Sequence, residues 1–390
     1  MIRREISIPI LSALLAAILM LPAAKGFFSE QHLTWAYIFL LAFGLSTGLV
    51  PIVMRVAKRI GAVDRPGGRK THQQVTPLMG GAAIYFGFAL VMILAQDILH
   101  FSQELKGVAI GATLIFMVGL LDDIFGLSAK IRRIAQLLAV GILMKYGVIL
   151  SFLPQTWWGD AGEILITFLW IVGITNAINF LDGMDGLASG TSAINAAFFS
   201  MFALRSGEPF MLLLSIALFG SCLGFLPYNF RRHQPASIFL GDSGSNFLGF
   251  TLAGIGILGE WGTDNWVGIV VPIVILGVPI FDTSLTTVVR IATGQVKTFG
   301  QWLRFTGRDH FHHRLSDLGL GNKRAVWVIY LISIGQGLQA LVLKNAHGVD
   351  ALFSLLQIGI LFLLMGGFMV FVQNSYNKLL EIRRRTSSHP

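Results

Sequence analysis

Twelve long apolar runs constrain the fold of this chain more than any other feature of its sequence. A helix needs roughly 20 apolar residues to cross the hydrocarbon core of a bilayer, and most of the runs have about that length. The runs are continuous rather than alternating between apolar and polar residues, so they predict helices and not the strands of a barrel. The ninth run is short, and we therefore expect about eleven to twelve transmembrane helices. The runs lie near residues 5–24, 33–56, 79–98, 104–121, 134–153, 162–180, 187–205, 210–228, 246–260, 265–290, 325–343 and 351–373.

The composition agrees with a membrane protein. Hydrophobic residues make up 54% and charged residues 13% of the 390 residues, whereas soluble domains carry about 25% charged residues. Lipid is therefore the solvent for most of the surface. We predict an all-α polytopic membrane protein in which residues 1–390 form a single integral membrane domain.

The two ends of the chain carry separate predictions. Residues 1–30 combine basic residues, an apolar stretch and small residues, which is the pattern of a signal peptide. The apolar stretch is long for a signal peptide, and eleven more runs follow, so we favour an extra, retained N-terminal transmembrane helix. Residues 374–390, which end in RRRTSSHP, are predicted to be a short cytoplasmic tail.

The distribution of basic residues predicts the orientation. If the N-terminus is cytoplasmic and there are twelve spans, most of the 29 Lys and Arg residues fall on the inner side, as the positive-inside rule requires. The net charge of +9 is then a topology signal. It does not indicate nucleic-acid binding, because no soluble domain is present to carry a basic face. The basic residues that fall on the outer side are Lys25, Lys106, Lys145, Arg205 and Lys344.

Five polar segments interrupt the apolar pattern, and each follows an even-numbered run. The topology therefore places all five on the cytoplasmic side. A secondary transporter would instead carry polar groups near the middle of its spans. A non-catalytic scaffold would not need five such segments. The segments are DRPGGRKTHQQVTPLMGG (64–81), DDIFGLSAKIRR (122–133), NAINFLDGMDGLASG (176–190), YNFRRHQPASIFLGDSGSNF (228–247) and GQVKTFGQWLRFTGRDHFHHRL (294–315).

The segments bring carboxylates and cations to one interface. Crowded carboxylates become tolerable around a divalent cation, and magnesium prefers one or two carboxylates plus substrate phosphates. Lys and Arg residues in the same segments are suitable phosphate partners. The mixture indicates metal-assisted chemistry on a phosphorylated substrate. The alternative is that each aspartate caps a helix or is solvated. The carboxylates are Asp122, Asp123, Asp182, Asp185 and Asp242.

The third segment has a regular spacing. Asn176, Asn179 and Asp182 follow one another at steps of three, which keeps side chains on one face of a helix. Gly183 and Gly186 then allow a turn or the close approach of a ligand. The segment is expected to offer amide and carboxylate oxygens where the sixth span reaches the interface.

Taken together, the five segments resemble the polyprenyl-phosphate N-acetylhexosamine-1-phosphate transferases, over a catalytic core of about residues 50–320. Bacterial members transfer a sugar 1-phosphate from a UDP-sugar to undecaprenyl phosphate, with magnesium (manganese is the alternative ion) and with release of UMP. The resemblance thus implies a multi-pass protein of the bacterial inner membrane that starts a cell-envelope polysaccharide, with its active site in cytoplasmic loops. The matching stretches are Arg69–Gly81, DDIFGLS from Asp122, Asn176–Gly190, FLGDSGSNFLG from Phe239 and HFHH from His310.

The resemblance also implies roles for individual residues. Asp242 and Asp182 match metal-binding positions, and Asp122, Asp123 and Asp182 are the predicted catalytic carboxylates, with Asp122 as the candidate general base. Lys70 and Asp185 match positions that contact the nucleotide. The predicted substrate-binding residues are Lys70, His72, Asn176, Asn179, Asp185, Phe239 (an aromatic position that stacks on uracil), His310, His312, His313 and Arg314.

The three histidines suggest zinc at first sight, but no Cys accompanies them. In the family this loop contacts the diphosphate and the sugar. Its HxHH form resembles the N-acetylglucosamine branch more than the muramyl-pentapeptide branch, so UDP-N-acetylglucosamine is the expected donor. Another UDP-N-acetylhexosamine or the muramyl-pentapeptide donor stays open, as do a homodimer and a transporter or flippase function.

Two mechanistic points stay open in the sequence. The lipid phosphate attacks directly, or an aspartate forms a covalent intermediate first. Asp282, in VPIFDTSLTTVVR, is an ionisable residue within an apolar run, which by default indicates a functional role.

Overall fold

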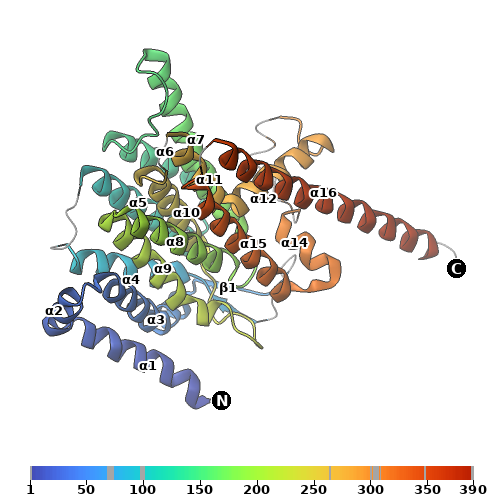
Figure 1. The fold of residues 1–390 in the computed structure, drawn as a ribbon. Coiled ribbons are helices and arrows are strands. Elements are labelled where there is room, and N and C mark those ends of the chain that lie inside the picture. The colour runs from blue at the N-terminus through green and yellow to red at the C-terminus, as the bar shows by residue number, and fades with distance from the viewer. Residues whose placement is uncertain are drawn as a thin grey trace.

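Helices account for nearly all of the fold in a computed structural model of the chain (Figure 1). The structure describes residues 2–67, 74–96, 102–262, 265–298, 301, 307, 309–346 and 348–387. The helical elements are α1 (Ile2–Leu19), α2 (Pro22–Glu30), α3 (Thr34–Ile60), α4 (Gly80–Leu94), α5 (Gln103–Phe125), α6 (Ala129–Lys145), α7 (Trp157–Leu181), α8 (Leu187–Ser206), α9 (Pro209–Asn229), α10 (Gly241–Leu258), α11 (Asn265–Ile275), α12 (Gly277–Ala292), α14 (Phe311–Leu315), the π-helical turn η1 (Ser316–Leu320), α15 (Asn322–Leu343) and α16 (Gly348–Ser387).

Two short strands are the exception. β1 (Val63–Asp64) pairs antiparallel with β2 (Thr76–Pro77), so that Val63 lies opposite Pro77 and Asp64 lies opposite Thr76. The strands follow α3 and precede α4. They set the path of the chain into the first turn of α4, which lies next to the candidate site described below.

The all-α polytopic class is confirmed, but the number of spans differs from the prediction. Each of the twelve apolar runs contains helix. Among the described residues, however, only seven helices are long and apolar enough to cross a membrane, or up to nine if each of two bent pairs is one span. Three runs account for the difference from twelve: α4 has only 15 residues, α6 has 17, and α10, with 18, does not qualify. The runs at 5–24 and 265–290 each form a bent pair, with bends of 74° and 78°.

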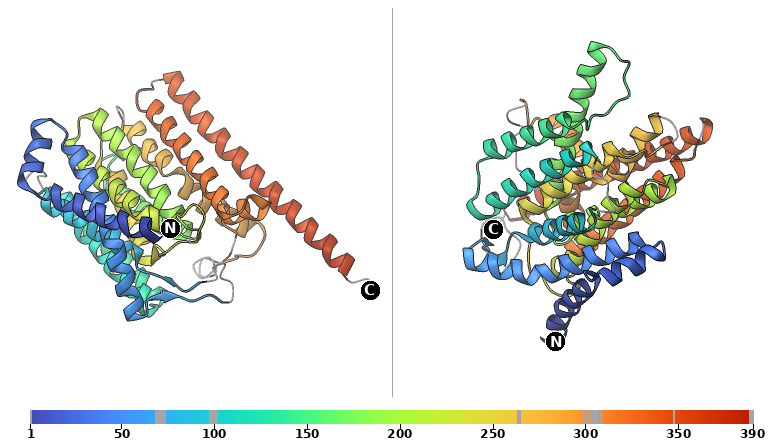
Figure 2. Two further views of the ribbon diagram at one scale, coloured as in Figure 1. Left: turned by 90° about the horizontal axis from the view of Figure 1, so that it is seen from below. Right: turned by 90° about the vertical axis from the view of Figure 1, so that its left-hand side faces the viewer.

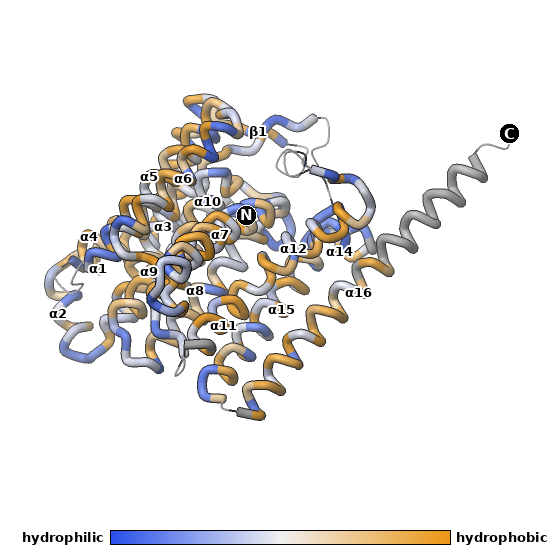
Figure 3. The backbone as a smooth tube through the Cα atoms, turned by 90° about the horizontal axis from the view of Figure 1, so that it is seen from above, coloured by the Kyte–Doolittle hydropathy of each residue, from blue (hydrophilic) through white to orange (hydrophobic). Residues whose placement is uncertain are grey.

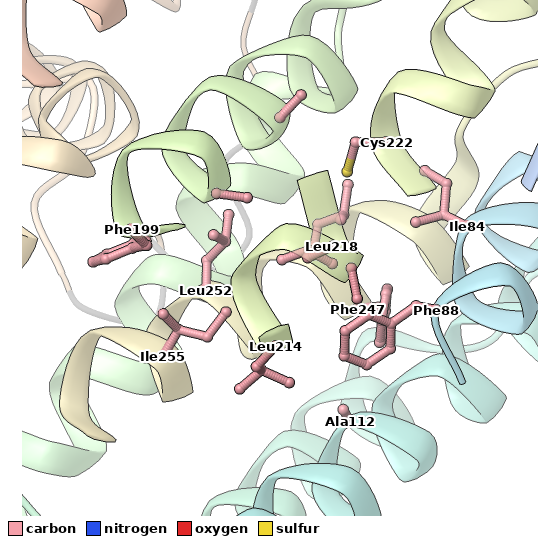
Figure 4. Packing of buried hydrophobic residues seen from close by; sticks show 14 of the residues in the cluster. Ile84, Phe88, Ala112, Phe199, Leu214, Leu218, Cys222, Phe247, Leu252 and Ile255 are labelled. Carbon is pink, nitrogen blue, oxygen red and sulfur yellow. The ribbon is translucent and has the colours of Figure 1, made fainter. Parts of the chain in front are cut away.

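The core of the bundle lies where α8, α9 and α10 meet α3, α4 and α5. Leu218 and Cys222 of α9 are fully buried beside Phe247 and Leu252 of α10 (Figure 4). Glycines bring the helix backbones together: a Cβ on Gly81 of α4 would lie 2.1 Å from the backbone nitrogen of Gly244 in α10. The N-terminal turn of α10 is therefore held close to that of α4.

The predicted extra N-terminal helix consists of two helices. α1 and α2 meet at 74°, because the chain turns before Pro22 starts α2. Ala16 of α1 contacts Gly44, and Ala13 contacts Gly48, so α1 packs antiparallel on α3 through small residues. The boundaries predicted for the catalytic core stay a prediction.

The last helix leaves the bundle. α16 continues through the predicted tail to Ser387 and projects away from the other helices (Figures 1 and 2). Figure 3 shows hydrophobic residues along most helices and hydrophilic segments around β1 and α14. These hydrophilic segments belong to the polar regions that the sequence places on one side.

Candidate active site

The candidate site is built around the first turn of α10. Phe239 donates its backbone N–H to the Pro77 carbonyl at 2.9 Å, and the Gly81 N–H donates to the Leu240 carbonyl at 2.7 Å. β2 and α4 thus hold the segment that enters α10. Gly241 then turns with a φ of +78°, a left-handed conformation that favours glycine. The turn places Asp242 in the first turn of the helix.

Asp123, at the end of α5, caps this turn from a distant part of the chain. Its carboxylate accepts hydrogen bonds from the backbone N–H of Asp242 at 2.7 Å, from that of Ser243 at 3.2 Å and from the Ser243 hydroxyl at 2.5 Å. The first N–H groups of a helix have no partner within the helix, and a carboxylate near them is favourable. A Cβ on Gly241 would lie 2.5 Å from the same carboxylate, which explains the glycine. Asp123 therefore fixes the position of Asp242.

Asp242 is held between an amide and a cation. Asn179 of α7 donates its Nδ2 to Asp242 Oδ1 at 2.7 Å. Arg132 of α6 places Nη1 3.0 Å from Asp242 Oδ2 and 2.9 Å from Asp122 Oδ2. The second oxygen of Asp122 accepts the Leu127 N–H at 2.5 Å. Four helices thus meet here, and the site residues predicted at Asp122, Asn179 and Asp242 lie together.

Asp182 lies next to these carboxylates, directly after the last residue of α7. Burial raises the pKa of its carboxyl well above the usual range, and so do the negative charges of three neighbours, Asp242, Asp123 and Asp185. The predicted acidic residues thus form one electrostatic cluster. The cluster favours a bound cation, because a cation would offset their repulsion.

The asparagines spaced three residues apart on α7 face two different helices. Asn176 faces α6, where its amide pairs with that of Gln136 at 3.4 Å, whereas Asn179 faces α10. Asp185 accepts the Ala236 N–H at 2.9 Å, so it supports the loop that leads to the half-buried Phe239. The predicted nucleotide residues Asp185 and Phe239 thus belong to adjoining turns.

The histidine segment docks on the same region. Asp282 of α12 accepts the Phe311 N–H at 2.6 Å and pairs with His310 Nδ1 at 2.9 Å. His312 is buried against Gly183, where a Cβ would lie 2.4 Å from its Nε2. The His313 ring lies beside the His312 ring, with centroids 4.2 Å apart. Asp282 is therefore a positioning residue for the HFHH segment.

Arg314 is anchored at one end of its guanidinium. Its Nε donates to the Asp309 carbonyl at 2.7 Å, and the Asp309 carboxylate forms two hydrogen bonds of 2.7 Å with Arg290. The Nη1 atom of Arg314 is buried and makes no hydrogen bond within the described part of the chain. That nitrogen is a hydrogen-bond donor that an anionic partner would satisfy.

Two predicted site residues, Lys70 and His72, lie outside the described residues.

Three residues contribute to the site but were not among the predicted site residues: Arg132, Ser243 and Asn229. Asn229 accepts the Gly186 N–H at 2.9 Å and donates to the Ile238 carbonyl at 3.0 Å, which joins the third and fourth polar segments. All three lie in the polar segments found in the sequence: Arg132 follows the DD pair in the second segment, and Asn229 and Ser243 belong to the fourth.

The donor set fits a divalent cation that substrate completes. In the described part of the chain, no three or more His, Cys, Asp or Glu residues are grouped so that they could hold a metal ion by themselves. Asp122 and Asp242 nevertheless both direct one oxygen at a single cationic nitrogen. Magnesium is usually bound by one or two carboxylates together with substrate phosphates, and Asp122 and Asp242 could supply the carboxylates of such a set.

Comparisons with known proteins show which family the chain resembles. The model of glycosyl transferase family 4 matches residues 105–260. The chain is 40% identical over 303 residues to the "Probable undecaprenyl-phosphate N-acetylglucosaminyl 1-phosphate transferase" of Bacillus subtilis, covering 76% of this chain and 82% of that protein. It is 35% identical to the "Decaprenyl-phosphate N-acetylglucosaminephosphotransferase" of Mycolicibacterium smegmatis, covering 73% and 75% of the two chains. It is 31% identical to the "Undecaprenyl-phosphate alpha-N-acetylglucosaminyl 1-phosphate transferase" of Escherichia coli K12, covering 71% and 75%.

The fold and the site define a polytopic membrane transferase. The chain belongs to glycosyl transferase family 4, among the polyprenyl-phosphate N-acetylhexosamine-1-phosphate transferases, and the resemblance drawn from the five polar segments is confirmed.

Proposed function

We propose that the protein transfers N-acetylglucosamine 1-phosphate from UDP-N-acetylglucosamine to undecaprenyl phosphate, releasing UMP. The names of the relatives support a polyprenyl phosphate acceptor and an N-acetylglucosamine phosphate group. The observation that carries the proposal is the convergence of Asp122, Asp242 and Arg132 at the ends of helices, where a diphosphate and its cation need opposite charges.

The reaction makes one bond and breaks one. An oxygen of the lipid phosphate attacks the β-phosphorus of the UDP-sugar, and the bond from that phosphorus to the oxygen of UMP breaks. A phosphate monoester has its second pKa near about 6, so the attacking group is largely dianionic near neutral pH. The attack therefore does not require removal of a proton by the protein.

The residues of the chain would bind the metal ion, position one another and contact the donor. Asp242 and Asp122 would hold magnesium, which when bound offsets charge on the reacting phosphates. Asp123 fixes Asp242 through the first turn of α10, and Asn179 orients its second oxygen. Asp282 orients His310, which we assign to the sugar or the diphosphate, and the Arg314 Nη1 is assigned to a phosphate oxygen.

The cellular setting belongs to the same proposal. A lipid-anchored acceptor and a nucleotide donor meet at the cytoplasmic face of the bacterial inner membrane, and the basic residues of the chain favour the polar segments facing that side. The product would start a cell-envelope polysaccharide.

A donor panel tests the proposal. Purified protein is incubated with undecaprenyl phosphate, magnesium and one UDP-sugar at a time, and both UMP and the lipid product are quantified. The proposal requires equal amounts of UMP and lipid product with UDP-N-acetylglucosamine. Turnover with only the N-acetylgalactosamine or muramyl-pentapeptide donor would reassign the substrate, and the absence of turnover with every donor would contradict the proposal.

A further inference from the structure

Arg132 occupies the position between the two carboxylates that a metal ion would take. Its Nη1 lies 2.9 Å from Asp122 Oδ2 and 3.0 Å from Asp242 Oδ2, so one nitrogen serves both acids. The Asp122 side chain is only 6% exposed, whereas that of Arg132 is 40% exposed. The cation is therefore the more accessible member of the cluster.

The second carboxylate oxygen of Asp122 and that of Asp242 each accept a hydrogen bond from the protein. Asp122 Oδ1 accepts the Leu127 N–H, and Asp242 Oδ1 accepts the Asn179 amide. Asp123 cannot replace either acid without releasing the first turn of α10, since both of its oxygens accept hydrogen bonds there. The two Oδ2 atoms that Arg132 contacts are therefore the positions of these two acids that an entering divalent cation would take by displacing Arg132.

We propose that Arg132 is an internal counter-ion of Asp122 and Asp242. A divalent cation would displace the Arg132 side chain, and the displaced guanidinium would then bind the donor diphosphate. The inference rests on the proposed function, because it takes a nucleotide diphosphate as the donor. A guanidinium binds phosphate through paired hydrogen bonds, so the displaced side chain gains a new anionic partner only when donor is present.

Cation and donor binding are therefore coupled. Without donor, the metal ion must expel a paired guanidinium and leave it in solvent. With donor, the same movement gives Arg132 a phosphate. Each ligand thus raises the affinity for the other by the same factor, as linkage requires, and such factors are commonly about 5- to 150-fold. The protein would hold little metal until its nucleotide substrate arrives.

Manganese binding tests the counter-ion directly, because free Mn²⁺ is measured by electron paramagnetic resonance without turnover. In the absence of donor, Arg132→Gln should bind Mn²⁺ roughly five- to tenfold more tightly than wild type, since a unit charge at this range is worth at least that factor. Arg133→Gln removes the same charge from the next position of α6 and should leave the affinity unchanged. UDP-N-acetylglucosamine should raise the Mn²⁺ affinity less in Arg132→Gln than in wild type.

A second pair of variants covers the case in which Arg132→Gln alone does not fold. Asp122→Asn and the double variant Asp122→Asn/Arg132→Gln avoid a buried unpaired carboxylate at residue 122. The double variant should bind Mn²⁺ more tightly than Asp122→Asn. Equal or weaker binding on loss of Arg132, in both backgrounds, would overturn the inference, and so would an equal gain in Arg133→Gln.

The test of the counter-ion proposal and the test of the proposed function can fail independently. Product formation by wild type with UDP-N-acetylglucosamine tests the function alone. If wild type turns over but removal of Arg132 does not tighten Mn²⁺ binding, only the counter-ion inference is wrong. If removal of Arg132 tightens Mn²⁺ binding but no donor is turned over, only the proposed function is wrong.

Discussion

The Asp123 carboxylate accepts the backbone N–H of Asp242 at 2.7 Å, across 119 positions of the chain. This contact joins the end of α5 to the start of α10. The two aspartates therefore have different roles. Asp123 stabilises the end of α10 that carries Asp242, and the Asp242 side chain contacts Arg132 and Asn179.

Replacement of the capping carboxylate should therefore cost stability as well as activity. In Asp123→Asn, an amide N–H₂ group faces the backbone donors of α10, and the charge that favours the helix end is lost. We expect the free energy of unfolding to fall by about 1–3 kcal/mol, the usual range for hydrogen bonds to a charged group. Thermal unfolding in detergent measures the change. Asp160→Asn, an exposed carboxyl in the first turn of α7, is the control for loss of a helix-end charge alone and should shift the midpoint less than Asp123→Asn. An unchanged midpoint in Asp123→Asn would contradict the capping role.

Asp242→Asn should show the opposite pattern. The substitution keeps the shape of the side chain and the Asn179 contact, but an amide is a poorer ligand for a hard cation. We expect the rate of transfer at saturating magnesium to fall roughly 10²- to 10³-fold, as for removal of one strong electrostatic stabiliser. The thermal midpoint should change less than in Asp123→Asn. Near-normal turnover would mean that Asp242 does not hold the metal ion.

The pH dependence of Asp122→Asn distinguishes a base from a positioning residue. If Asp122 removed a proton from the lipid phosphate, raising the pH through about 6 would restore the rate, since the phosphate then ionises without help. Asp122 accepts the Leu127 N–H and pairs with Arg132, and the proposed function assigns it to the metal ion and not to a proton transfer. We therefore expect a deficit that stays constant between pH 5.5 and about 8.5. The measurement is the pH–rate profile of the variant and of wild type at saturating lipid and magnesium. Recovery of the variant's rate at high pH would mean that Asp122 is the general base.

A double-mutant cycle tests the pairing of Asp282 with His310. Each side chain acts through the other, so Asp282→Asn and His310→Gln should each reduce kcat/KM, and the double variant should be no worse than the more damaged single variant. The measured quantity is the coupling term from four kcat/KM values. Additive losses would show that Asp282 does not work through His310.

Much of the fold followed from the apolar runs, because a continuous run in lipid has only the helix as a stable conformation. The bends within the helices could not be predicted from the apolar runs. The break between α11 and α12 lies within a single apolar run, and no loss of hydrophobicity marks it. Seven to nine helices among the described residues are long and apolar enough to span, against eleven to twelve predicted, and the class of fold was predicted correctly.

The convergence of Asp122, Asn179 and Asp242 was predictable, since one topology places their segments on one side. The individual contacts that define the role of each residue could not be predicted. The partner of Asp282 is His310, 28 positions away, and nothing in the local sequence around either residue indicates the other. Likewise, several basic residues were candidates for a phosphate partner, and only the packing of α6 against α5 and α10 singles out Arg132.

The fate of one phosphorus atom tests the central claim most directly. UDP-N-acetylglucosamine labelled with ³²P at the β-phosphate, the one that bears the sugar, is incubated with the purified protein, undecaprenyl phosphate and magnesium. Transfer of a sugar phosphate predicts that the label moves into the organic-extractable lipid and that the released nucleotide is unlabelled UMP. Release of labelled UDP would show that only the sugar is transferred, and it would contradict the account.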